Sequence, residues 1–92
     1  MNVTGSRALV EDSGELDDAI ATIRAADLDP EHFDIDVQRM PDVANPKTGV
    51  YPIRYAVKIT NRASGRGATL AGGHGEAWVA RLEEKLIAGD FV

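Results

Sequence analysis

The sequence predicts a single α+β domain in which two helices pack on one face of a three-stranded antiparallel sheet. Apolar residues recur at helical spacing in one segment near each end of the chain, and between these segments apolar and polar residues alternate as they do in strands. A run of strands flanked by helices favours an antiparallel sheet with its helices on one face. The 92 residues suffice for one domain but not for two, so we expect residues 1–92 to share one core.

The first helix is predicted over residues 12–26. Asp12, with Glu15 three residues later, fits a capping box, and Ser13 is an alternative cap. The helix ends before Pro30, because the residue that precedes a proline is disfavoured in helical geometry. The apolar stripe that predicts this helix consists of Leu16, Ala19, Ile20 and Ile23.

Alternation predicts the strands. Every second side chain is apolar in residues 32–38, which is typical of a half-buried strand. Residues 51–60 alternate strictly and carry β-branched and aromatic side chains, so they are the clearest strand of the chain. Residues 68–71 follow a glycine-rich turn as a short third strand. Residues 7–10 form either a short strand or an ordered lead-in to the first helix.

The last helix is predicted to begin near Glu76 and to end at Gly89, which stands where a C-terminal glycine belongs. Residues 72–75, Gly-Gly-His-Gly, predict a tight turn before it. They lack the Lys-Ser/Thr pair of a phosphate-binding loop, and Glu76 places a negative charge where a phosphate would lie. The apolar stripe of this helix consists of Trp78, Val79, Leu82, Leu86 and Ile87.

The composition excludes cysteine chemistry. The chain has no cysteine, which rules out disulfides and thiolate zinc sites and favours a reducing, intracellular setting. Residues 1–10 lack the long apolar run of a signal peptide, and no stretch approaches the ~20 apolar residues that a membrane-spanning helix needs. We therefore expect a cytoplasmic protein without membrane contact.

The charge is unevenly distributed. Residues 1–42 hold 11 of the 15 acidic residues and 3 of the 10 basic ones, and the net charge of the chain is −5. Binding to DNA or RNA is disfavoured, because a phosphate backbone needs a basic footprint. An acidic surface instead attracts a basic partner, although solubility alone also explains an acidic surface.

From this charge pattern we expect a protein-binding module or inhibitor that docks on a basic surface of a larger protein or ribonucleoprotein complex. The carboxylates predicted to form the docking surface are Glu11, Asp12, Glu15, Asp17, Asp18, Asp34 and Asp36. Secondary contacts are expected from Arg54, Lys58, Arg62, Arg66 and, if it is exposed, Trp78. A homodimer that pairs an exposed strand edge is a further alternative.

The outer face of the predicted sheet mixes both signs of charge. It is interpreted either as a charge ladder that keeps the sheet soluble or as a polar docking face. Its side chains are His32, Asp34, Asp36, Gln38, Arg54, Lys58 and Arg62. His32 and Asp36 would lie ~13 Å apart along a strand, too far to ligate one ion, so we predict no metal site and no cofactor. No catalytic motif is present, and the alternative is a small enzyme or ligand-binding domain that uses His32, His74 and nearby carboxylates.

Two resemblances accompany this interpretation. The predicted order of elements, with a glycine-rich turn before the last helix, is similar to a double-stranded-RNA-binding domain. The final helix of that family opens with phosphate-gripping lysines, whereas residues 74–78 here are His-Gly-Glu-Ala-Trp, so RNA binding is not transferred. In its small size, acidity and lack of cysteine, the chain also resembles inhibitors from phages and mobile elements, including anti-CRISPR proteins. That resemblance implies that carboxylates block a surface that binds nucleic acid.

Overall fold

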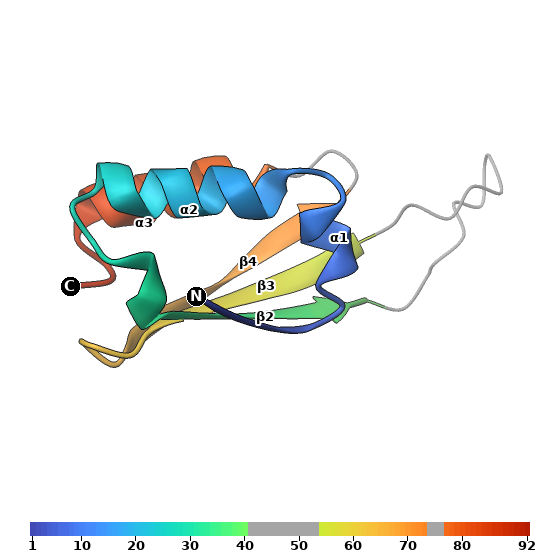
Figure 1. The fold of residues 1–92 in the computed structure, drawn as a ribbon, viewed down its shortest axis with the longest axis horizontal. Helices are drawn as coiled ribbons and strands as arrows, with labels where there is room; N and C mark the ends of the chain where they lie inside the picture. The colour runs from blue at the N-terminus through green and yellow to red at the C-terminus, as the bar shows by residue number, and fades with distance from the viewer. Residues whose placement is uncertain (41–53, 74–76) are drawn as a thin grey trace, which may run out of the picture.

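A computed structural model gives the fold and describes residues 1–40, 54–73 and 77–92 (Figure 1). The elements in chain order are β1 (Asn2–Gly5), α1 (Ala8–Glu11), α2 (Glu15–Ala25), a 3₁₀ turn (Pro30–His32), β2 (Phe33–Arg39), β3 (Arg54–Asn61), β4 (Arg66–Gly73) and α3 (Trp78–Ala88). Residues 51–53 of the predicted second strand and residues 74–76, where the last helix is predicted to begin, lie outside the described residues.

The predicted order of helix, three strands and helix is confirmed by α2, β2, β3, β4 and α3. The sheet nevertheless has four strands, in the spatial order β1-β2-β3-β4. It is mixed, because β1 runs parallel to β2 while the other neighbours are antiparallel. The prediction of three strands, all antiparallel, is therefore wrong in these details. β1 holds one large apolar side chain, Val3, in four residues, which is too few for alternation to show.

The connection between β1 and β2 contains two helices in place of the predicted one. Residues 8–11 form the short helix α1, so the interpretation of residues 7–10 as a strand is wrong. Asp12 caps the C-terminus of α1, and the N-cap of α2 is Gly14, whose φ of 78° lies in the left-handed region that glycine tolerates best. Parallel neighbours such as β1 and β2 cannot be joined by a tight hairpin, and α1 and α2 supply the longer crossover.

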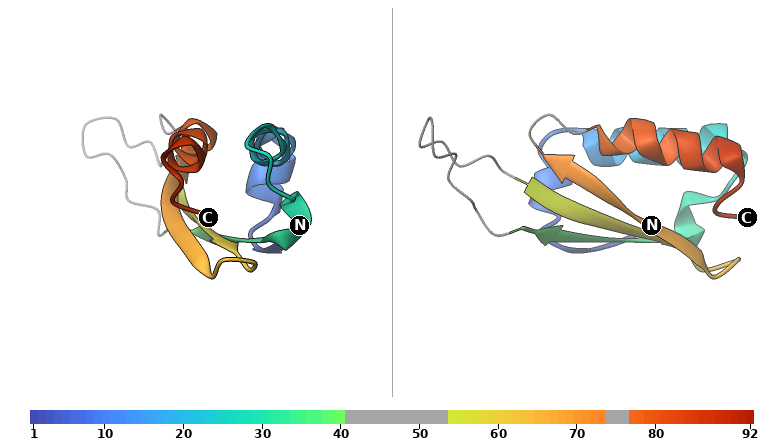
Figure 2. Two further views of the ribbon diagram at one scale, coloured as in Figure 1. Left: turned by 90° about the vertical axis from the view of Figure 1, so that its left-hand side faces the viewer. Right: turned by 180° about the vertical axis from the view of Figure 1, so that it is seen from behind.

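Helices α2 and α3 lie side by side over one face of the sheet and leave the other face open (Figures 1 and 2). The predicted inward-facing residues of the strands are buried wherever the structure describes them. The core consists of Val10, Ala19, Ile23, Phe33, Ile35, Val37, Tyr55, Val57, Ile59, Leu70, Trp78, Leu82, Leu86 and Phe91. Asn61 is buried among them, and its side-chain amide donates a hydrogen bond of 2.8 Å to the backbone carbonyl of Phe91.

Two residues of the predicted α3 stripe, Trp78 and Ile87, differ sharply in exposure. Trp78 is fully buried, as a core residue of that stripe should be. Ile87 is 79% exposed, so its assignment to the core stripe is wrong. Ile87 follows Trp78 by nine positions, which rotates their side chains roughly 180° apart and places Ile87 on the opposite side of α3. Gly89 ends the helix with a φ of 80°, which confirms its predicted place.

Gly72 belongs to β4 and not to the predicted turn. It is paired with Tyr55 of β3, and the Tyr55 ring lies across it. A Cβ atom on residue 72 would lie 2.2 Å from Tyr55 Cε2, so only glycine leaves room for the ring. In the described residues no helix has the length and the apolar character that crossing a bilayer requires.

Candidate functional site

Four carboxylates are exposed around the junction of α1 and α2. Glu11 ends α1, Asp12 caps it, and Asp17 and Asp18 lie in the first turn of α2. We call these four residues the acidic helix surface. Glu11 is paired with Arg7, whose Nε atom lies 2.6 Å from Glu11 Oε1. Among the described residues, Asp12, Asp17 and Asp18 have no ion-pair partner, so their carboxylates are available to another molecule.

Glu15 is separated from this surface by its hydrogen bonds. Its Oε1 atom accepts a bond of 2.5 Å from the Tyr55 hydroxyl and one of 2.9 Å from Ser13 Oγ. The half-buried Glu15 carboxylate is therefore turned toward β3, where it links the start of α2 to Tyr55. The prediction that Glu15 joins the other acids in one docking surface receives no support from this geometry.

The Tyr55 hydroxyl is the one group among the described residues with a large pKa shift. Burial, followed by the hydrogen bond and the negative charge of Glu15, raises the pKa of Tyr55 from 10.0 to about 12. The Trp78 indole and the Gly73 backbone lower it, but burial prevails. The Trp78 indole N–H is itself buried without a hydrogen bond of ordinary geometry, so we assign it only a weak electrostatic contact with the phenol. Tyr55 thus stays protonated, as a structural donor to Glu15.

Asp34 and Asp36 lie on the open face of the sheet, because they alternate with the buried side chains of β2. Arg62 Nε lies 3.4 Å from Asp34 Oδ1. Asp36 Oδ1 accepts hydrogen bonds from Thr4 Oγ1 at 3.1 Å and from Gln38 Nε2 at 2.9 Å, and Asp36 lies opposite Lys58 in the strand register. These contacts support the interpretation of the face as a charge ladder. The seven predicted carboxylates therefore do not form one surface, since these two lie across the sheet from α2.

The predicted secondary contacts also lie apart from the acidic helix surface. Arg54 and Lys58 are exposed on β3, and Arg66 is exposed at the start of β4. Arg62 is held by Asp34 and by the Glu31 backbone carbonyl, to which its guanidinium donates. Trp78 has no exposed surface, so the condition under which it was expected to contact a partner is not met.

The described residues give no geometric support to the alternative site built from His32, His74 and nearby carboxylates. His32 is exposed, and its Nε2 atom lies 3.9 Å from Asp29 Oδ2. His74 lies outside the described residues. In the part of the chain that the structure describes, no group of three or more His, Cys, Asp or Glu side chains is placed to hold a metal ion.

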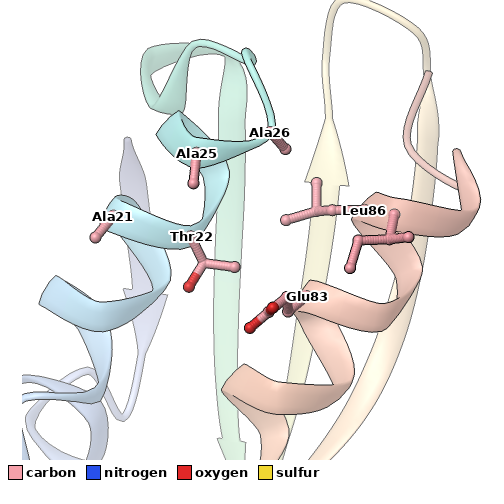
Figure 3. A pocket seen from close by; sticks show the side chains of 7 residues that line it. Ala21, Thr22, Ala25, Ala26, Glu83 and Leu86 are labelled. Atoms are coloured by element: carbon pink, nitrogen blue, oxygen red, sulfur yellow. The ribbon is translucent and has the colours of Figure 1, made fainter.

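A groove between α2 and α3 was not anticipated from the sequence (Figure 3). It has a volume of about 390 Å³ and is lined by Ala21, Thr22, Ala25, Ala26, Glu83, Leu86 and Ile87. The available signal was the row of small residues on α2, outside its apolar stripe. On this side of α2, no large side chain of the row fills the space toward the adjacent helix α3.

Comparisons with known proteins give no match: no family model, no curated protein and no solved structure is similar to this chain. Function is therefore inferred from the residues themselves.

Proposed function

We propose that this chain is a protein-binding inhibitor or adaptor that docks through the acidic helix surface on a basic surface of a larger protein or ribonucleoprotein complex. The observation that carries the proposal is the set of exposed carboxylates at Asp12, Asp17 and Asp18, which have no ion-pair partner in the described part of the chain. By contrast, Asp34 is paired with Arg62, and Asp36 accepts hydrogen bonds from Thr4 and Gln38.

Unpaired carboxylates favour association in two ways. They attract a basic partner over a distance of about one Debye length, ~8 Å at physiological ionic strength, which raises the association rate. They also form new ion pairs without first breaking internal ones, so the partner's lysines and arginines gain contacts at no cost to the fold. The short distance between α1 and α2 in the sequence keeps these charges on one end of the molecule (Figure 1).

Surfaces that bind DNA or RNA are basic, because they must neutralise phosphates. Carboxylates presented by a small rigid domain can occupy the positions that phosphates would take. This is the form of inhibition that the resemblance to anti-CRISPR proteins implies, and we extend it to this chain as part of the proposal.

The proposal is tested by changing the charge of the surface without changing the core. Asp17→Asn with Asp18→Lys alters two exposed positions of α2. Proteins captured by the wild-type chain from its source cells are identified, and the affinity of the purified partner is measured by calorimetry at low and at physiological ionic strength. We expect the double variant to bind at least about tenfold more weakly and with a smaller dependence on salt. Unchanged affinity of the true partner contradicts the proposal.

A further inference from the structure

The groove between α2 and α3 has the shape of a docking site for one side chain of a visiting helix. Its α2 wall is built from small residues, including Ala21 and Ala25, which leave space that larger side chains would fill. Its α3 wall carries Leu86 at the base and Ile87 at the rim, and Ile87 is 79% exposed. An apolar side chain placed in the groove would therefore be surrounded by apolar atoms on both sides and would cover Ile87.

The parallel course of α2 and α3 favours a helix as the ligand of the groove. In Figure 3 the chain rises from Ala21 to Ala25 on α2 and from Glu83 to Leu86 on α3, so the two helices run side by side in the same direction. Two such helices leave a straight furrow between them, and side-chain ridges of a third helix fit a furrow of this kind. Amphipathic helices bind grooves in this way through apolar residues spaced three and four apart.

The charge of the groove favours a basic ligand. Glu83 is the only charged residue among the seven that line it. Asp18 precedes Thr22 by four residues on α2, so their side chains lie on the same side of the helix and the acidic helix surface adjoins the α2 wall. A helix that carries lysines or arginines beside its apolar residues would place them near both carboxylates.

We propose that the α2–α3 groove binds a basic amphipathic helix of the partner, with one branched apolar side chain seated between Ala25 and Ile87. This inference rests on the proposed function, because the same acidic surface guides the visiting helix. It goes further by naming the chemistry of the partner segment and the place where its apolar side chain lies.

The test uses synthetic peptides as probes. One peptide is an amphipathic helix with leucines on one face and lysines on the other, and its control has the same leucines with glutamates in place of the lysines. Binding is measured by calorimetry and located by changes in amide chemical shifts. We expect the lysine peptide to bind with shifts centred on residues 21–26 and 83–87, and the glutamate peptide to bind at least about tenfold more weakly. Equal binding of both peptides, or shifts centred on the open sheet face, overturns the proposal.

Matched variants distinguish an effect of charge inside the groove from a general effect of net charge. Glu83 lies in the groove, whereas its neighbour Glu84 is directed to the side of β4. Glu83→Lys should weaken the lysine peptide about five- to tenfold, and Glu84→Lys, with the same change in net charge, should weaken it less than about twofold. Equal effects of the two variants would show a general charge effect and would overturn the groove.

The apolar contact has its own pair of variants. Ile87→Ala removes the exposed rim, and Val92→Ala removes an apolar side chain that is 63% exposed elsewhere. We expect about tenfold weaker binding of the lysine peptide for Ile87→Ala and no change for Val92→Ala. Ala25→Phe, at an exposed position, should fill the groove and abolish the shifts at residues 83–87. Binding that survives Ala25→Phe contradicts the proposal.

Binding of the partner captured from source cells distinguishes the proposal of the acidic helix surface from that of the α2–α3 groove. If Asp17→Asn with Asp18→Lys weakens that partner while Ala25→Phe and Ile87→Ala do not, the acidic surface is retained and the groove is refuted. If none of these changes has an effect, both are refuted. If light scattering instead shows that the chain self-associates and that Ala25→Phe makes it monomeric, the occupant is a second copy, and the basic helix is refuted.

Discussion

Replacing Tyr55 with phenylalanine should alter how the stability of the fold depends on pH. The pKa of Tyr55 is raised from 10.0 to about 12 by burial and by Glu15, so the folded state keeps the phenol proton after the unfolded state has lost it. Between pH 10 and pH 12 the unfolded chain binds fewer protons, and stability therefore falls as pH rises. A difference of two pH units corresponds to at most about 2.7 kcal/mol lost across this window. The full contribution is present below pH 10.

The measurement is chemical denaturation of the wild-type chain and of Tyr55→Phe at a series of alkaline pH values. At neutral pH the variant should be less stable by about 1–2 kcal/mol, since Glu15 loses one of its two donors but keeps Ser13. The difference between the two proteins should then shrink from pH 10 to pH 12, because only the wild-type chain loses the Tyr55 contribution. A Tyr51→Phe background isolates the phenolate absorbance of Tyr55. A constant difference between the proteins, or a phenolate that forms near pH 10, would refute the reasoning.

Three further changes test the packing by denaturant titration. Gly72→Ala should destabilise the fold by about 1–3 kcal/mol, because its Cβ would lie 2.2 Å from Tyr55 Cε2. In a Tyr55→Ala background the same change should cost less, because the clashing ring is gone. Asn61→Ala should cost about 0.5–1.5 kcal/mol, because it removes the 2.8 Å bond to the Phe91 carbonyl, which keeps a 2.7 Å bond from Ser64 Oγ; a cost near zero would argue against the Asn61 bond. Leu82→Ala should cost about 2–5 kcal/mol while Ile87→Ala costs less than about 0.5 kcal/mol, since Leu82 is 0% and Ile87 79% exposed; similar costs would contradict the assigned faces of α3.

The parts of the fold that could be predicted are those in which one face is buried along a whole element. Ile35 and Val37 in β2, and Val57 and Ile59 in β3, alternate with polar residues because water lies on one side of the sheet and the helices on the other. Such a pattern is visible in one sequence. Its period of two also fixes which residues face the core.

The first segment of the chain could not be predicted, because its elements are too short to repeat a pattern. β1 has four residues and is positioned by pairing with β2, and α1 has a single buried residue, Val10. Both elements depend on tertiary contacts for their stability, since an isolated helix of one turn is unstable in water. The break at Gly14 also divided what looked like one helix.

The candidate site was predicted in part for a similar reason. The sequence shows where carboxylates are but not which of them are engaged. Glu15 and Asp17 are two residues apart, yet one accepts a hydrogen bond from Tyr55 and the other is exposed. Only the position of Tyr55, forty residues away, separates them. The α2–α3 groove likewise requires both helices, since neither wall alone indicates a concave surface.

The central claim is that the acidic helix surface, and not net charge in general, binds the partner. The decisive measurement compares two double variants with the same change in charge against the captured partner. One is Asp17→Asn with Asp18→Lys, and the other is Asp27→Asn with Glu84→Lys, at exposed positions away from the acidic helix surface. We predict at least about tenfold weaker binding for the first variant and less than about twofold for the second. Equal losses, or no loss in either, would contradict the claim.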